Sequence, residues 1–235
     1  MTFLADAIEQ RDWADIEQKL GMEGFAHLPG LINADASRYL AHQSLSLLAS
    51  QSESLASKDL GQGHVAYLGQ SLPTPWLSGR TAFYRHLAPM ANRWNQALGV
   101  AYRYPGHFEE FQEQNRRDGQ TQALSHVIRL GTGDYLSLHQ RNLGARIFPM
   151  QVIVLLSDPG ADFGGGELVM TEQRPRMQSR PMVLPLAIGD AAIISTSERP
   201  FKGTKGYYRA NIKHAISRVR HGDRVGVELS FHDAP

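Results

Sequence analysis

From residue 124 to the end, the chain is a series of short β-forming runs separated by turns, and this pattern limits the fold more than any other feature of the sequence. Eight such runs can be read, among them FPMQVIVLLS (148–157), GELVMTE (166–172) and RVGVELSFH (224–232). The segments between them are rich in Gly, Asp and Pro, as in DPGADFGGG and AIGD. Runs of this length and spacing are typical of a double-sheet jelly roll rather than of a βαβ protein. We therefore predict a jelly-roll core over residues 124–235.

The beginning of the chain carries a helical pattern instead. Trp13, Ile16 and Leu20 recur at helix spacing, and two glycines then separate them from a short apolar run at residues 25–28. The pattern predicts one helix followed by one short strand.

Two longer patterns predict further helices within residues 35–56 and 80–99, the second with a kink or break near Pro89. Between them, residues 58–80 are rich in Gly and Pro and lack periodicity, so an irregular segment is expected there. The predicted fold class is thus α+β. A mainly helical N-terminal part, residues 1–123, packs against the cupin-like jelly roll, also called a double-stranded β-helix, as one compact unit.

Composition removes several classes of function. The chain has no cysteine, which excludes disulfides, thiol nucleophiles and cysteine-ligated metals. Its formal net charge of +1 argues against a general nucleic-acid coat. No signal-peptide pattern opens the sequence, and no apolar run approaches the roughly 20 residues of a membrane span, so we expect a cytoplasmic protein with no membrane partner. Any metal site must use His, Asp or Glu.

One strand-like motif, GDYLSLHQRNLG, delivers a histidine in a way that suits metal binding. Tyr135, Ser137 and His139 alternate with leucines and share one strand face, and His214 lies on a late run, NIKHAISRVR. A facial site for non-heme iron needs two imidazoles and one carboxylate, often supplied as His-x-Asp or His-x-Glu plus a distant His. Here Arg141 stands where that carboxylate is expected.

Several motifs together resemble a known family. They are GDYLSLHQ, GGELVMTEQRPRMQSR, NIKHAISRVR and the terminal FHDA. The chain resembles the bacterial nucleic-acid oxygenase family of 2-oxoglutarate and iron(II)-dependent oxygenases, which is distantly similar to the prolyl hydroxylases and to the alkylated-DNA repair dioxygenases. The resemblance covers residues 124–235 closely and extends weakly into the N-terminal half.

This resemblance implies roles for particular residues. His139 and His214 match the two iron-binding histidines. Arg224 matches the arginine that holds the far carboxylate of 2-oxoglutarate, by a bidentate charge-assisted pair, and Arg218 is a second candidate. The main departure is Arg141, which occupies the position of the aspartate in the motif His-Gln-Asp.

The expected function is accordingly an Fe(II)- and 2-oxoglutarate-dependent dioxygenase that carries out oxidative C–H chemistry. Its substrate is expected to be a small or anionic molecule. Nucleic acid is not favoured, because the basic version of the family's middle segment is missing here. We interpret His126, His221 and His232 as structural histidines.

Arg141 leaves four outcomes open, because a guanidinium has no free lone pair and cannot ligate iron. In the first outcome, Arg141 swings out and leaves a two-histidine site of the kind seen in iron halogenases. A carboxylate from elsewhere, such as Asp134 or Glu167, takes over. In a third outcome, the protein is an unusual iron enzyme, such as a halogenase or an enzyme with an alternative third ligand. Alternatively the metal is absent, Arg141 itself is an anion-binding group of the catalytic pocket, and the protein is a silent relative that binds a ligand or a partner.

Overall fold

The structure is a computed structural model that describes residues 3–69 and 72–235. Its helices all precede residue 118, and none of those described combines the length and hydropathy that a membrane span requires. They are α1 (Phe3–Glu9), α2 (Trp13–Glu23), α3 (Ala34–Gln51), a 3-10 turn η1 (Leu55–Lys58), α4 (Thr74–Ala97) and α5 (Phe108–Arg117).

The strands form two large antiparallel sheets and a small one. The seven-stranded sheet contains, in spatial order, β1 (Phe25–Leu28), β11 (Ala191–Ser195), β7 (Met150–Leu155), β15 (Arg224–Leu229), β5 (His126–Leu130), β4 (His64–Tyr67) and β2 (Glu53–Ser54). The six-stranded sheet contains β10 (Arg180–Leu184), β9 (Leu168–Gln173), β13 (Gly206–Ile216), β6 (Tyr135–His139) and β3 (Gly61–Gln62), with β12 (Glu198–Gly203) paired to β13. Strands β14 (Val219–Gly222) and β8 (Phe163–Gly165) form the third sheet.

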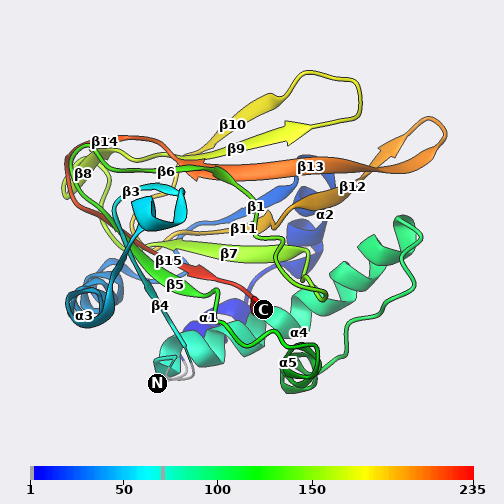
Figure 1. The fold of residues 1–235 in the computed structure, drawn as a ribbon, viewed down its shortest axis with the longest axis horizontal. Helices are drawn as coiled ribbons and strands as arrows, with labels where there is room; N and C mark the ends of the chain where they lie inside the picture. Colours follow the sequence, from blue (N-terminus) through cyan, green and yellow to red (C-terminus); the bar gives the residue numbers. More distant parts are fainter. Residues whose placement is uncertain (1–2, 70–71) are drawn as a thin grey trace.

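The chain passes back and forth between the two large sheets from β5 onward. β5, β7, β11 and β15 lie in the seven-stranded sheet, whereas β6, β9, β10 and β13 lie in the six-stranded one. In Figure 1 the layer of β7, β15 and β5 lies between helices α4 and α5 on one side and β9, β10 and β13 on the other. The seven-stranded sheet is therefore the central layer.

Side chains alternate between the two faces of the central strands, and this alternation produces two hydrophobic cores. On β7, Val152 and Val154 pack toward the helices, while Ile153 and Leu155 pack between the two sheets. All six residues of this strand are buried, as are all six of β15. A strand covered on both faces reads as a continuous apolar run, which explains why MQVIVL shows no polar alternation.

The N-terminal part confirms some expectations and corrects one. Helix α2 ends before Gly24, which adopts the left-handed conformation (φ 82°), and β1 follows as expected. Helix α4 continues through Pro89 without a break. The prediction that residues 58–80 are irregular is wrong for most of that segment.

That segment contains β3, β4 and the beginning of α4. Two- and four-residue strands are too short to show periodicity, and prolines in a first helical turn are compatible with a helix because the N–H groups there lack intrahelical partners. Residues 70–71 lie outside the described residues. β4 pairs with β5 and β1 pairs with β11, so the N-terminal part contributes strands to the central sheet as well as helices.

One buried ion pair fastens α2 to the sheets. Arg199 on β12 is fully buried and pairs with Glu172 on β9, and its Nη1 donates to the carbonyl oxygen of Gly21 at 2.8 Å. The arginine thus satisfies a carbonyl near the end of α2 that has no partner within the helix.

Candidate metal centre

The two histidines of the sequence motif meet on neighbouring strands. His139 on β6 is directly opposite His214 on β13 in the sheet register, and their ring centroids are 4.2 Å apart. The structure thus brings together two imidazoles that are far apart in the sequence.

The ring of His139 is prepared to act as a ligand. Its Nδ1 lies 2.9 Å from the carbonyl oxygen of Ser137, and since a carbonyl only accepts, Nδ1 carries the proton. Nε2 then has a free lone pair, and it is buried without a hydrogen-bond partner among the described residues. Burial, together with nearby His214 and Arg141, lowers the pKa of His139 to about 3, so the ring is neutral near pH 7.

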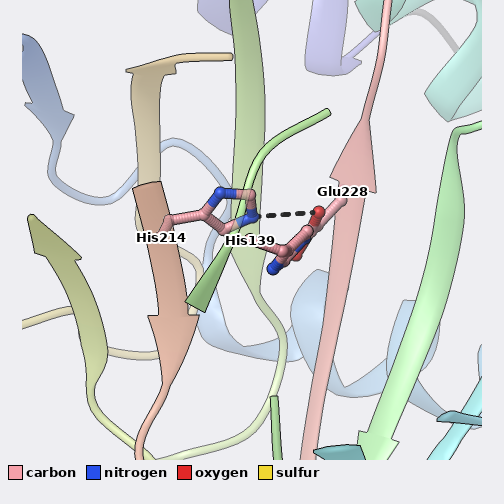
Figure 2. A group of neighbouring side chains, drawn as sticks. All are labelled: His139, His214 and Glu228. Atoms are coloured by element: carbon pink, nitrogen blue, oxygen red, sulfur yellow. Dashed lines mark ion pairs between the residues drawn. The ribbon is translucent and has the colours of Figure 1, made fainter. Parts of the chain in front are cut away.

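The third member of the cluster comes from the opposite sheet. Glu228 on β15 points between the sheets, with its Oε2 3.6 Å from Nε2 of His214 (Figure 2). One ligand atom each from His139, His214 and Glu228 all lie within 4.8 Å of one another. Burial alone would raise the pKa of Glu228, but His126, His214 and Arg141 hold it well below its usual range. The group is therefore a carboxylate, and neither oxygen has a hydrogen-bond donor in the described structure.

The acidic residue of the cluster is Glu228, not Asp134 or Glu167, the two acids suggested by the sequence as substitute carboxylates. Oδ2 of Asp134 accepts from the backbone N–H of Gly131 at 2.9 Å, and Glu167 is exposed and accepts from the hydroxyl of Ser217. Both acids stabilise turns instead of facing the histidines. A sequence signal for Glu228 exists in hindsight, since it is an acidic residue inside the apolar run VGVELSF.

Arg141 does not swing out of the site. It is only 7% exposed, with Nη2 3.8 Å from Oε2 of Glu228 and 3.4 Å from Nε2 of His126. Because Nδ1 of His126 bonds the carbonyl oxygen of Leu124, Nε2 of His126 accepts from Arg141. His126, expected to be purely structural, is thus in contact with the cluster through both Arg141 and Glu228.

Of the two arginines expected to hold 2-oxoglutarate, only Arg224 lies on the strand face of Glu228. Arg224, Gly226 and Glu228 alternate on the inner face of β15, and the Arg224 Nη1 lies 3.2 Å from the point where a Cβ on Gly226 would be. Its Nε donates to the carbonyl oxygen of Gly166 at 2.9 Å, while Nη1 is buried without a partner in the described residues. Arg218 is exposed, with its guanidinium over the ring of Tyr135.

The donor set suits a divalent iron ion. Two imidazoles and one carboxylate are the donors of the facial triad. Nε2 of His139 and both oxygens of Glu228 are buried without hydrogen-bond partners among the described residues, as atoms available to a metal ion would be. The amide nitrogen of Gln151 lies 3.2 Å from Nε2 of His214 and helps to fix that ring. A cavity of about 440 Å³ reaches the cluster, with His139 and Arg141 in its wall.

Comparisons with solved structures show the fold. A prolyl hydroxylase from Trichoplax adhaerens, in complex with a hypoxia inducible factor peptide fragment, is 15% identical with a TM-score of 0.59, over 98% of this chain and 92% of its own. A Pseudomonas putida prolyl-4-hydroxylase is 12% identical with a TM-score of 0.53, over 95% and 99%. A 2OG-Fe(II) oxygenase family protein from Burkholderia pseudomallei is 16% identical with a TM-score of 0.55, over 96% and 93%.

Comparisons of sequence are more specific. Two uncharacterized proteins from two strains of Mycobacterium tuberculosis are each 36% identical over 155 residues, which is 66% of this chain and 66% of theirs. Just under two thirds of the length of these relatives is therefore matched. The model of the family Oxygenase-NA, described as an oxygenase catalysing oxidative methylation of damaged DNA, matches residues 63–234. With most of its length matched, including every residue of the cluster, the chain belongs to the Oxygenase-NA family.

Proposed function

We propose that this protein is an Fe(II)- and 2-oxoglutarate-dependent dioxygenase whose iron is held by His139, His214 and Glu228. The observation that carries the proposal is the convergence of these three donors within 4.8 Å, with His214 and Glu228 buried and His139 half-buried. In this assignment the carboxylate comes from β15 instead of from the position of Arg141. The alternation of strands between two sheets supports a jelly roll, or double-stranded β-helix, around the site.

Each residue has a distinct task in this proposal. His139 offers the free lone pair of its Nε2, His214 offers a ring nitrogen, and Glu228 offers an anionic oxygen that compensates part of the charge of the ion. Gln151 keeps the His214 ring in place. When bound, Fe(II) with 2-oxoglutarate as electron donor would allow dioxygen to act as the oxidant for cleavage of a substrate C–H bond.

Arg224 is assigned to the cosubstrate. Burial lowers the pKa of its guanidinium to about 10, so the group stays cationic near pH 7. Its unpartnered Nη1 is free to donate to the far carboxylate of 2-oxoglutarate. The backbone contact with Gly166 holds the side chain in that position before any ligand arrives.

The test is to measure metal content and turnover of the same purified protein. The protein should bind one equivalent of Fe(II) under anaerobic conditions, show a weak visible charge-transfer band when 2-oxoglutarate is added, and form succinate in air. His139→Ala and His214→Ala should lose the metal, while His42→Ala, on the exposed face of α3, should keep it.

Failure has a clear form. Protein that takes up no metal at excess Fe(II) and forms no succinate would be a silent relative that binds a ligand through the same cavity. A reaction that persists in Glu228→Ala but changes its product would indicate a halogenase-like two-histidine site.

A further inference from the structure

Arg141 brings one positive charge more than a facial triad with a cosubstrate arginine contains. Before metal binds, its charge is matched by Glu228, 3.8 Å away. A divalent ion bound to Glu228 would take over that carboxylate. The two negative charges of 2-oxoglutarate would then be matched by Arg224 and by what remains of the charge of the ion. Arg141 is left without an anion of its own.

The surroundings of Arg141 do not offer a replacement. Its Nε is buried without a hydrogen-bond partner in the described residues, and its Nη2 contacts Nε2 of His126, a ring nitrogen that accepts a hydrogen bond but carries no negative charge. The acidic residue in the wall of the 440 Å³ cavity is Glu53, which pairs with Lys58 at 2.9 Å. A buried cation with unused donors, facing a cavity, is a receptor for an anion.

The rest of the cavity indicates what kind of anion fits. Its wall combines Leu60, Tyr67, Leu124 and Leu143 with the neutral amides of Gln122 and Gln140, and the cavity has room for a small molecule. Recognition of nucleic acid uses many cations along a phosphate backbone, whereas the cationic side chains in this wall are Arg141 and the already paired Lys58. The chemistry is that of one carboxylate on a largely apolar body.

From this charge balance and this wall, we propose that Arg141 binds the carboxylate of a small, largely apolar monocarboxylic acid, and that this acid is the substrate of the metal centre. The role as substrate rests on the proposed function, but the binding of the carboxylate by Arg141 does not.

The experiment measures carboxylate binding directly by isothermal titration calorimetry. Butyrate, hexanoate and phenylacetate are titrated into metal-free protein and into anaerobic protein saturated with Mn(II) and 2-oxoglutarate. The matching primary amides, inorganic phosphate and a short single-stranded oligonucleotide are the comparison ligands. We expect the acids to bind and to bind more tightly to the loaded protein, because the ion removes Glu228 as a competitor for Arg141.

Variants assign the binding to one residue. Arg141→Gln should weaken the acids about 10- to 100-fold, the effect of losing a hydrogen-bonded charged partner. Arg141→Lys should fall between, since it keeps the charge but loses the planar fork. Lys58→Gln removes a cation from the same wall and should change affinity less than about threefold, because Lys58 is engaged by Glu53. Thermal melting checks folding, and Arg141→Gln with Glu228→Gln provides a charge-balanced version for the metal-free titration.

Nuclear magnetic resonance adds a distance-dependent readout, because Mn(II) broadens the proton signals of ligands that bind near it. This broadening should be strong for the acids bound to the wild type. Equal affinity of the acids for wild type and Arg141→Gln, or preference for phosphate or the oligonucleotide, would overturn the inference. If the acids bind through Arg141 but no metal is taken up, the proposed function fails and the receptor stands. If metal and 2-oxoglutarate bind normally while acid binding ignores Arg141, only this inference fails.

Discussion

The replacement Glu228→Gln separates the metal-binding role of this carboxylate from its role in the fold. Glutamine has nearly the same shape, so the main change is the loss of one negative charge between the sheets. In the metal-free protein, the attraction between Glu228 and Arg141 at 3.8 Å corresponds to about 4 kcal/mol at an effective dielectric constant of about 20. Removal of a buried carboxylate also removes a desolvation penalty of several kcal/mol. This gain offsets only part of the loss, because Arg141 remains as a buried cation without a carboxylate partner. We therefore expect the metal-free protein to lose about 3 to 5 kcal/mol of stability.

Metal binding has no such compensation. The Glu228 carboxylate would attract a divalent ion in direct contact at least twice as strongly as it attracts the single charge of Arg141. A water molecule in place of the carboxylate would recover only part of that attraction. We therefore expect metal affinity to fall by at least about 4 kcal/mol, or roughly 1,000-fold. The assay is competition for Co(II) or Zn(II) against a chromophoric chelator, beside a urea titration of the metal-free protein.

The chain offers a matched control and a rescue. Glu167→Gln removes an acid that bonds Ser217 in a turn and should leave metal affinity unchanged. The double variant Arg141→Asp with Glu228→Gln moves the carboxylate to the third position of a His-x-Asp motif and should restore affinity to within about tenfold of wild type. Wild-type metal affinity in Glu228→Gln, or its loss in Glu167→Gln, would refute the assignment of Glu228 as a ligand.

Three further predictions test other parts of the structure. Burial, together with nearby Arg80, lowers the pKa of His232 to about 4, so between pH 6.5 and 4 the unfolded state binds more protons than the folded state. The free energy of unfolding should therefore fall by about 3 kcal/mol as the pH drops from 6.5 to 4. Urea titrations of His232→Asn should show a smaller loss over the same range. Gly189 has φ 79°, and a Cβ there would collide with the carbonyl oxygen of Ile32, so Gly189→Ala should lower the melting temperature by about 5 °C or more; an unchanged melting curve would contradict the geometry. Gly226→Ala should push the Arg224 guanidinium aside and weaken 2-oxoglutarate about tenfold in calorimetry, with metal affinity retained.

The histidine pair was predicted from the sequence, whereas Glu228 was recognisable only in hindsight, as an acidic residue inside an apolar run. His139 lies in a half-exposed strand whose leucines alternate with polar residues, so its face could be read, and the resemblance supplied His214. Glu228 lies in a strand in which every residue is buried. Such a strand gives no signal for which side chains face which layer, and that orientation depends on pairing with β5 and β7.

The same physical reason separates the fold features that could be predicted from those that could not. Long amphipathic helices such as α2 carry their own periodicity, so a sequence shows them. β4 has four residues and is fixed by its pairing with β5, which a local pattern does not contain. The position of Arg141 was readable as a departure from His-x-Asp, but its inward orientation depends on contacts with His126 and Glu228.

Because His139 and His214 belong to one sheet and Glu228 to the other, an ion in this cluster would link the two sheets. Any loosening that let the two layers slide apart would dismantle the coordination sphere before the chain lost its strands. The melting temperature of the metal-loaded protein should therefore depend on how closely the two sheets pack. Core residues far from the ion would then influence the affinity for the metal.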